Sequence, residues 1–164
     1  MQAEILKSLE LFKGLNETQF DQIKDICFQA DYAQGDRLFK EKENAHSLWI
    51  NYNGTIELRF ELPGTSATSS DQTLRSITGS PDNAQLIGWS CLVPPYKYRL
   101  SAYCVSPTCQ VLKIDKTDLF RLFEKDHAIG YFFLSKLIKI VGSRFIDLQD
   151  HLAQIKGEDL INQW

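Results

Sequence analysis

The hydrophobic pattern divides the chain into helical ends and a strand-like middle. Residues 1–27 carry two short apolar stretches with helical spacing, and the second starts at Asn16, whose side chain can form a capping box with Gln19. Residues 28–114 consist of short β-prone runs separated by turn residues. We therefore predict a mainly β fold with flanking helices: an antiparallel β-roll of the jelly-roll or cupin type, a double-stranded β-helix, between N-terminal helices and a long C-terminal helix.

The clearest turn signal in the β region is the pair Asn53-Gly54, since Asn-Gly suits the positive φ angles of a type I′ turn. It predicts a hairpin between the runs 47–52 and 55–62. The small and polar residues 63–73 are interpreted as a loop within the same region. The other strand-like runs are 28–32, 37–40, 74–77, 85–87, 98–105 and 110–114.

Helical spacing returns after residue 114. Asp115 is expected to cap a short helix over 116–123, and a longer helix is expected over about 127–156, which leaves 157–164 as a tail. Apolar positions of the long helix are spaced alternately four and three residues apart. This is the pattern of a coiled-coil seam and predicts a homodimer, whereas the alternative is an ordinary apolar stripe lying on the β-roll. The seam consists of Leu134, Ile138, Val141, Phe145, Leu148, Leu152 and Ile155.

Composition narrows the function classes. A chain of 164 residues with 43% hydrophobic residues suits one compact domain, and its net charge of −3 argues against a general binder of nucleic-acid backbones. There is no apolar run of membrane-spanning length, and Glu4 and Glu10 interrupt the apolar start as a signal peptide would not allow. We expect a cytoplasmic protein whose cysteines are buried free thiols, namely Cys27, Cys91, Cys104 and Cys109.

The order of elements, together with two motifs, resembles the cyclic nucleotide-binding domain family over residues 5–155. Residues 35–39, GDRLF, are similar to the family's G-x-x-I/L-F turn and strand, and residues 45–54, AHSLWINYNG, are similar to its A-x-x-x-Y-x-I hairpin with a following glycine. The resemblance implies a non-catalytic regulatory domain that binds a small anionic ligand and signals through its C-terminal helices. It also implies that DNA binding needs a further domain after the long helix, so none is expected from this chain alone.

Residues 87–102 resemble the family's phosphate-binding cassette, F-G-E-L/I-A-L…P-R-A/S-A-T. The resemblance implies that Gly88 is the cassette glycine and that Ser90 and Cys91 lie in a short helix whose N–H groups face the cyclic phosphate. It further implies that Arg99 neutralises the phosphate, with Lys97 as the fallback cation, and that Ser101 keeps the small character after the arginine.

Two residues depart from the cassette pattern. Trp89 stands where the family has the glutamate that accepts from the ribose 2′-hydroxyl, and Leu100 stands where it has a small or hydroxyl residue. Because an indole N–H only donates, Trp89 cannot replace the carboxylate. Losing a hydrogen bond to a charged acceptor costs about 1.5–3 kcal/mol, roughly ten- to a hundredfold in affinity. Binding of cyclic AMP or cyclic GMP in the usual pose is therefore expected to be weak, and Trp89 is expected either to fill the pocket or to stack on a ligand.

Several alternatives stay open at this point. The domain could have lost its ligand and act as a dimerisation or scaffold module, which Trp89 and Leu100 favour. Arg99 could be a solvated strand residue, and Cys91 could be a sensor thiol or a small core residue. A cupin-type metal enzyme would need converging histidines, and only His46 of His46, His127 and His151 falls in the β region. No catalytic motif, required cofactor or metal site is predicted.

Overall fold

A short helical layer precedes the β-roll. The computed structural model describes residues 2–61 and 72–161, so most of the predicted loop 63–73 and the end of the tail lie outside the described residues. The first elements are α1 (Gln2–Ser8), the 3₁₀ turn η1 (Glu10–Phe12) and α2 (Glu17–Asp25). The predicted capping box is confirmed. The backbone N–H of Gln19 donates to Asn16 Oδ1 at 2.9 Å, and the backbone N–H of Asn16 donates to Gln19 Oε1 at 3.2 Å.

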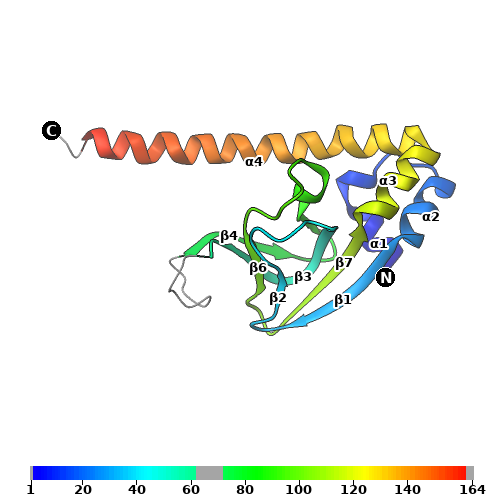
Figure 1. Ribbon diagram of the computed structural model, residues 1–164, viewed down its shortest axis with the longest axis horizontal. Coiled ribbons are helices and arrows are strands. Elements are labelled where there is room, and N and C mark those ends of the chain that lie inside the picture. The colour runs from blue at the N-terminus through cyan, green and yellow to red at the C-terminus, as the bar shows by residue number, and fades with distance from the viewer. Residues whose placement is uncertain (1, 62–71, 162–164) are drawn as a thin grey trace.

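In the described residues, seven antiparallel strands curl into the predicted roll (Figure 1). The hydrogen-bonded order is β1-β7-β3-β6-β2, and β4 and β5 both pair with β3. β3 therefore belongs to both sides of the roll and ties them together. The strands are β1 (Cys27–Ala33), β2 (Arg37–Phe39), β3 (Ser47–Arg59), β4 (Thr73–Gly79), β5 (Gln85–Ile87), β6 (Ser101–Cys104) and β7 (Thr108–Asp115).

The predicted hairpin at Asn53-Gly54 is wrong, because the strand β3 continues through these residues without reversing. Its pairing with β7 shifts register between Asn51 and Asn53, and Gly54 adopts a φ of +90°. A side chain at Gly54 would overlap the carbonyl oxygen of Thr108. The Asn-Gly pair thus supplies a bulge that bends one strand from one side of the roll to the other, instead of reversing the chain.

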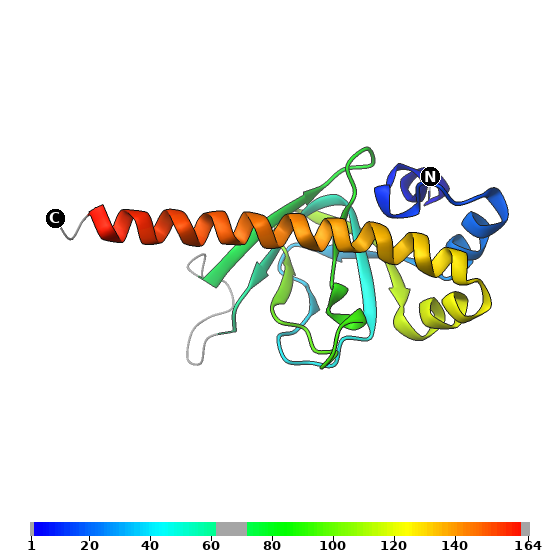
Figure 2. The same ribbon diagram turned by 90° about the horizontal axis from the view of Figure 1, so that it is seen from above.

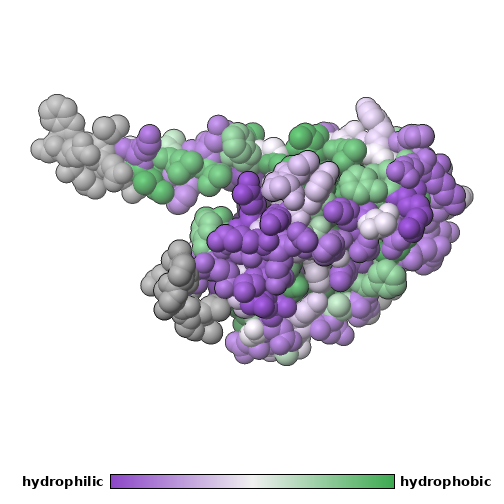
Figure 3. All heavy atoms as spheres, in the orientation of Figure 1, coloured by the Kyte–Doolittle hydropathy of each residue, from purple (hydrophilic) through white to green (hydrophobic). Residues whose placement is uncertain are grey.

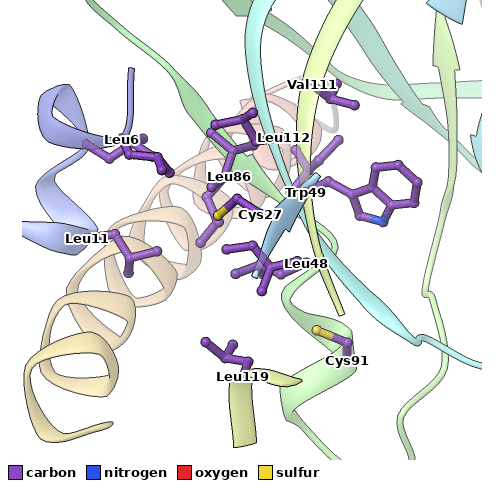
Figure 4. Packing of buried hydrophobic residues seen from close by; sticks show 14 of the residues in the cluster. Leu6, Leu11, Cys27, Leu48, Trp49, Leu86, Cys91, Val111, Leu112 and Leu119 are labelled. Carbon is purple, nitrogen blue, oxygen red and sulfur yellow. The ribbon is translucent and has the colours of Figure 1, made fainter. Parts of the chain in front are cut away.

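Alternation along β3 separates the core from the interior of the roll. Leu48 and Ile50 are fully buried on the face toward the helices, and Figure 4 shows Leu48 gathered with Leu86 and Leu112 on the side of Leu6 and Leu11. Trp49 points away from this group, as expected for the residue between two core positions of a strand. The helical layer therefore covers one face of the sheet, and the other face lines the roll.

The C-terminal helices follow β7 directly. Asp115 caps α3 (Lys116–Lys125) by accepting from the Thr117 amide at 2.7 Å, as predicted. α4 spans His127–Ile161, crosses over the roll and extends beyond it (Figures 1 and 2). Two side chains of α4 bind the rest of the domain. Lys136 Nζ donates to Glu10 Oε1 in η1 at 2.9 Å, and the Arg144 guanidinium donates to the carbonyl oxygen of Leu86 at 2.5 Å.

One cysteine pair differs from the sequence-based expectation. Cys104 ends β6, Cys109 lies in β7, and the turn between them brings their Cα atoms to 5.9 Å, where the structure joins them in a disulfide. The expectation of free thiols is therefore wrong for these two residues, whereas Cys27 and Cys91 are free and buried as predicted. Because disulfides are rare in cytosolic proteins, the pair gives no support to the cytoplasmic location, which stays a prediction.

Candidate ligand-binding site

The backbone of the predicted cassette begins where β5 ends. Gly88 has a φ of +74° and caps the 3₁₀ helix η3 (Trp89–Leu92). A Cβ atom at Gly88 would lie 2.7 Å from Trp49 Cδ1 and 3.2 Å from the carbonyl oxygen of Ser47. Glycine is therefore required here both for the left-handed backbone and for the close approach of η3 to β3.

Three aromatic side chains fill the interior of the roll beside η3. We call Phe39, Trp49 and Tyr98 the interior aromatic cluster. Phe39 stacks on Tyr98 with ring centroids 4.1 Å apart, and its ring lies 6.0 Å from that of Trp49. A Cβ atom at Gly88 would lie 3.4 Å from the Tyr98 ring, so the cluster packs directly against the start of the cassette.

The Tyr98 hydroxyl fixes this cluster to the backbone of β3. It accepts from Trp49 Nε1 at 3.2 Å and from the Ser47 amide at 3.3 Å, and it donates to the Ser47 carbonyl oxygen at 3.0 Å. Burial is the main cause that raises the pKa of Tyr98. A neutral, fully bonded phenol thus lies beside Gly88, at the start of the predicted cassette.

The cation expected to neutralise a phosphate lies elsewhere. Arg99 and Lys97 are exposed, whereas Tyr98 between them is buried. Within the described part of the chain, the Arg99 guanidinium has no hydrogen bond or ion pair. Gly88, Trp89, Ser90 and Cys91 share one turn, and the structure does not bring Arg99 into the interior beside them. Lys113 lies over the Trp49 ring of the cluster, with its Nζ 5.1 Å from the ring centre.

The residues after Arg99 belong to a polar network that the sequence did not reveal. Leu100 is partly buried, and Ser101 is fully buried and donates from its hydroxyl to Glu61 at 2.6 Å. The Tyr103 hydroxyl donates to the same carboxylate oxygen at 2.7 Å. These hydrogen bonds, that of Ser101 first, lower the pKa of Glu61. The Ser101 hydroxyl is therefore already hydrogen-bonded within the protein. The sequence signal for this network is the strand alternation, which puts Ser101 and Tyr103 on one face of β6.

Trp89 and Cys91 occupy the 3₁₀ turn itself. Trp89 is half-buried and packs against the hydrophobic core. Cys91 is completely buried, and burial raises the pKa of its thiol to about 12. Because thiolate is the reactive form, Cys91 lacks the character of a sensor thiol and suits the role of a small core residue.

The seam residues of α4 lie mostly on the surface. Ile138 is 67% exposed and Leu152 is 53% exposed, whereas Val141 packs partly against the core. Figure 3 shows apolar side chains along α4, including the part that extends past the roll. The exposed seam residues are Leu134, Ile138, Phe145, Leu148, Leu152 and Ile155.

Two further features bear on the alternatives. Residues 2–61 and 72–161 contain no group of three or more His, Cys, Asp or Glu side chains placed to hold a metal ion. Among the helices of these same residues, none combines the length and the apolar character that a membrane span requires.

Comparison with known proteins shows the fold. No protein-family model matches the chain, and a search of curated proteins finds no match. A solved cyclic nucleotide-binding domain from Methylobacillus flagellatus is similar, with a TM-score of 0.73 at 16% identity over 92% of this chain and 80% of that one. The N-terminal domain of a transcriptional regulator from Streptomyces coelicolor has a TM-score of 0.65 at 20% identity over 90% of this chain and 94% of that one.

A eukaryotic structure is similar as well. The regulatory domain of Toxoplasma gondii PKA, solved with cAMP, has a TM-score of 0.64 at 14% identity; the match covers 85% of this chain and 49% of that one. This chain therefore spans about half of that structure. The likenesses show that the chain has the fold of cyclic nucleotide-binding domains, which confirms the predicted fold class.

Proposed function

We propose that this chain is a non-catalytic regulatory module that pairs with a second copy through α4 and does so without a cyclic nucleotide in its roll. The observation that carries this proposal is the exposed apolar seam of α4, from Leu134 to Ile155. Exposed apolar side chains arranged in heptads are stabilised when a second helix covers them.

The interior aromatic cluster supports the second half of the proposal. Its rings already stack on one another, and Trp49 Nε1 together with the Ser47 backbone satisfies the Tyr98 hydroxyl, so a nucleotide would have to displace the rings. Trp89 offers no acceptor for a ribose hydroxyl, and Arg99 lies at the surface. A nucleotide would therefore break the packing and hydrogen bonds of the cluster, and Trp89 and Arg99 would not replace them with the usual cassette contacts.

Light scattering of the purified chain at micromolar concentration tests the pairing. The proposal expects a mass of twice 18.8 kDa. A mass of 18.8 kDa, that of a monomer, across the micromolar range would contradict the proposed pairing through α4.

The predicted sensor of a small anionic ligand is the second candidate, and a specific observation favours it. Gly88 keeps the left-handed conformation and the 3₁₀ turn that the cassette needs, although Arg99 stands outside. Thermal unfolding with and without millimolar cyclic AMP or cyclic GMP separates the two candidates. A ligand at 100 times its dissociation constant adds about 2.7 kcal/mol and raises the Tm by several degrees. An unchanged Tm favours the ligand-independent module.

A further inference from the structure

The first half of α4, residues 127–144, has other helices on both flanks. The ring of Phe133 has its centre 6.0 Å from that of Phe12 in η1 and 5.1 Å from that of Phe123 in α3. Figure 2 shows the N-terminal helices on one side of this half and α3 on the other. Any helix that pairs with the first half of α4 must therefore fit beside these neighbours.

The second half of α4 has no such neighbours. We call residues 145–161 the overhang, because Figure 1 shows this part extending beyond the roll. Every residue from 145 to 156 is exposed. The overhang is thus a bare helix about 10–12 Å across, whereas the first half carries a helical layer on each flank.

This difference bears on the direction in which two α4 helices can pair. In a parallel pair, the flanked first half of each copy would have to approach the flanked first half of the other. In an antiparallel pair, each first half meets only the bare overhang of the other copy. The surroundings of α4 therefore favour the antiparallel direction.

The charges along α4 favour the same direction. Residues 127–144 contain three basic residues and no acidic one, whereas residues 145–161 contain four acidic residues and one basic residue. A parallel pair brings like charges together at both ends, and an antiparallel pair brings opposite charges together. Arg144, the basic residue closest to the overhang, donates to the carbonyl oxygen of Leu86 in its own copy, which holds it toward the roll.

The apolar seam fits an antiparallel pair in one register. Tyr131, three residues before Leu134 and 71% exposed, continues the alternating spacing by one step. With a two-fold axis beside Ser143, every seam residue of one copy faces a seam residue of the other, and none is left over. The facing pairs, one residue from each copy, are Tyr131 with Ile155, Leu134 with Leu152, Ile138 with Leu148, and Val141 with Phe145.

We propose that a second copy of this chain binds α4 in the antiparallel direction, with each overhang lying along the first half of the other copy. This inference rests on the proposed pairing through α4 and adds its direction and register. Each overhang covers Tyr131, Leu134 and Ile138 of the other copy, beside η1 and α3. The contact between the copies therefore lies next to the helical layer of each roll.

Disulfide cross-linking between single-cysteine variants tests the direction. Leu134→Cys and Leu152→Cys are about half exposed sites, so neither change disturbs the core. In the antiparallel pair, residue 134 faces residue 152, whereas the two copies of residue 134 lie about 27 Å apart, too far for a disulfide. We expect a covalent dimer when the two variants are mixed and oxidised with copper phenanthroline, and none from either variant alone.

Two controls and one further measurement make the result decisive. Ala153→Cys lies one position off the seam and should cross-link to Leu134→Cys several-fold less than Leu152→Cys does. The unmodified protein, in which Cys27 and Cys91 are buried, shows what the native thiols contribute. Cross-linking of Leu134→Cys or Leu152→Cys alone would overturn the antiparallel direction and leave the pairing through α4 standing.

Light scattering of the same variants before oxidation separates the remaining outcomes. A dimer whose mixed variants do not cross-link overturns the proposed direction and register. A monomer overturns this inference together with the proposed pairing on which it rests.

Discussion

Replacing Leu152 by glutamate tests how much of the pairing energy lies in the far part of α4. Leu152 is 53% exposed, so about half of its side chain remains for a partner to bury. Full burial of a leucine contributes ~1.5–3 kcal/mol, which gives ~0.8–1.6 kcal/mol per protomer and ~1.6–3.2 kcal/mol for the two copies in a dimer. At ~1.4 kcal/mol per tenfold, Leu152→Glu should weaken dimerisation at least roughly ten- to two-hundredfold. The desolvation of the new carboxylate adds to this loss.

Sedimentation equilibrium gives the dissociation constant of the variant and of a matched control. Ala153→Glu introduces the same charge one position further along α4, off the seam, at another exposed residue. It should change the dissociation constant by less than about fivefold, because a surface substitution alters stability by about 0.5 kcal/mol at most and the dimer carries two copies of it, about 1 kcal/mol in all. Equal effects of Leu152→Glu and Ala153→Glu, or no effect of either, would refute the reasoning that the seam is the contact.

Other predictions concern the cassette turn, the cluster and the base of α4. Gly88→Ala should destabilise the protein by about 1–3 kcal/mol in urea unfolding, because it strains a left-handed residue and crowds Trp49; an unchanged midpoint would contradict the observed turn. Tyr98→Phe should cost about 1–3 kcal/mol, because Trp49 Nε1 loses its acceptor, and a loss below about 0.5 kcal/mol would show that the hydroxyl is dispensable. Hydrogen bonding from Lys136, and then from Lys13, lowers the pKa of Glu10 from its ordinary 4.5 to about 2. The contribution of ionised Glu10 to folding stability is therefore complete above pH 4.5 and is lost as the pH falls toward 2. Lys136→Met should raise the pKa of Glu10 in an NMR titration.

The sequence predicted correctly those features that depend on residues close together in the chain. Asn16 and Asp115 cap helices by bonds to residues two or three positions away, and such bonds can be recognised from spacing alone. The Asn53-Gly54 pair shows the limit of this reasoning. Gly54 has the positive φ that the turn signal predicts, but Asn53 does not. Whether a residue such as Gly54 reverses the chain or bends it depends on the pairing of β3 with β7 and β6, which is set by distant residues.

In the candidate site, too, one feature could be predicted from nearby residues and others could not. Gly88 could be recognised because its backbone conformation excludes other residues. The interior aromatic cluster could not be predicted, since Phe39, Trp49 and Tyr98 come from three separate segments that meet only in the closed roll. The outward position of Arg99 could not be predicted either. Arg99 lies at a bend between the buried Tyr98 and the buried Ser101, where strand alternation does not set the direction of a side chain.

Sedimentation equilibrium of the unmodified chain, with and without millimolar cyclic AMP, tests whether α4 pairs independently of a nucleotide. We expect a reversible dimer whose dissociation constant is the same, within twofold, in both conditions. A monomer in the absence of nucleotide that dimerises only when cyclic AMP is added would contradict it, because the roll would then open to a ligand and control α4 from there.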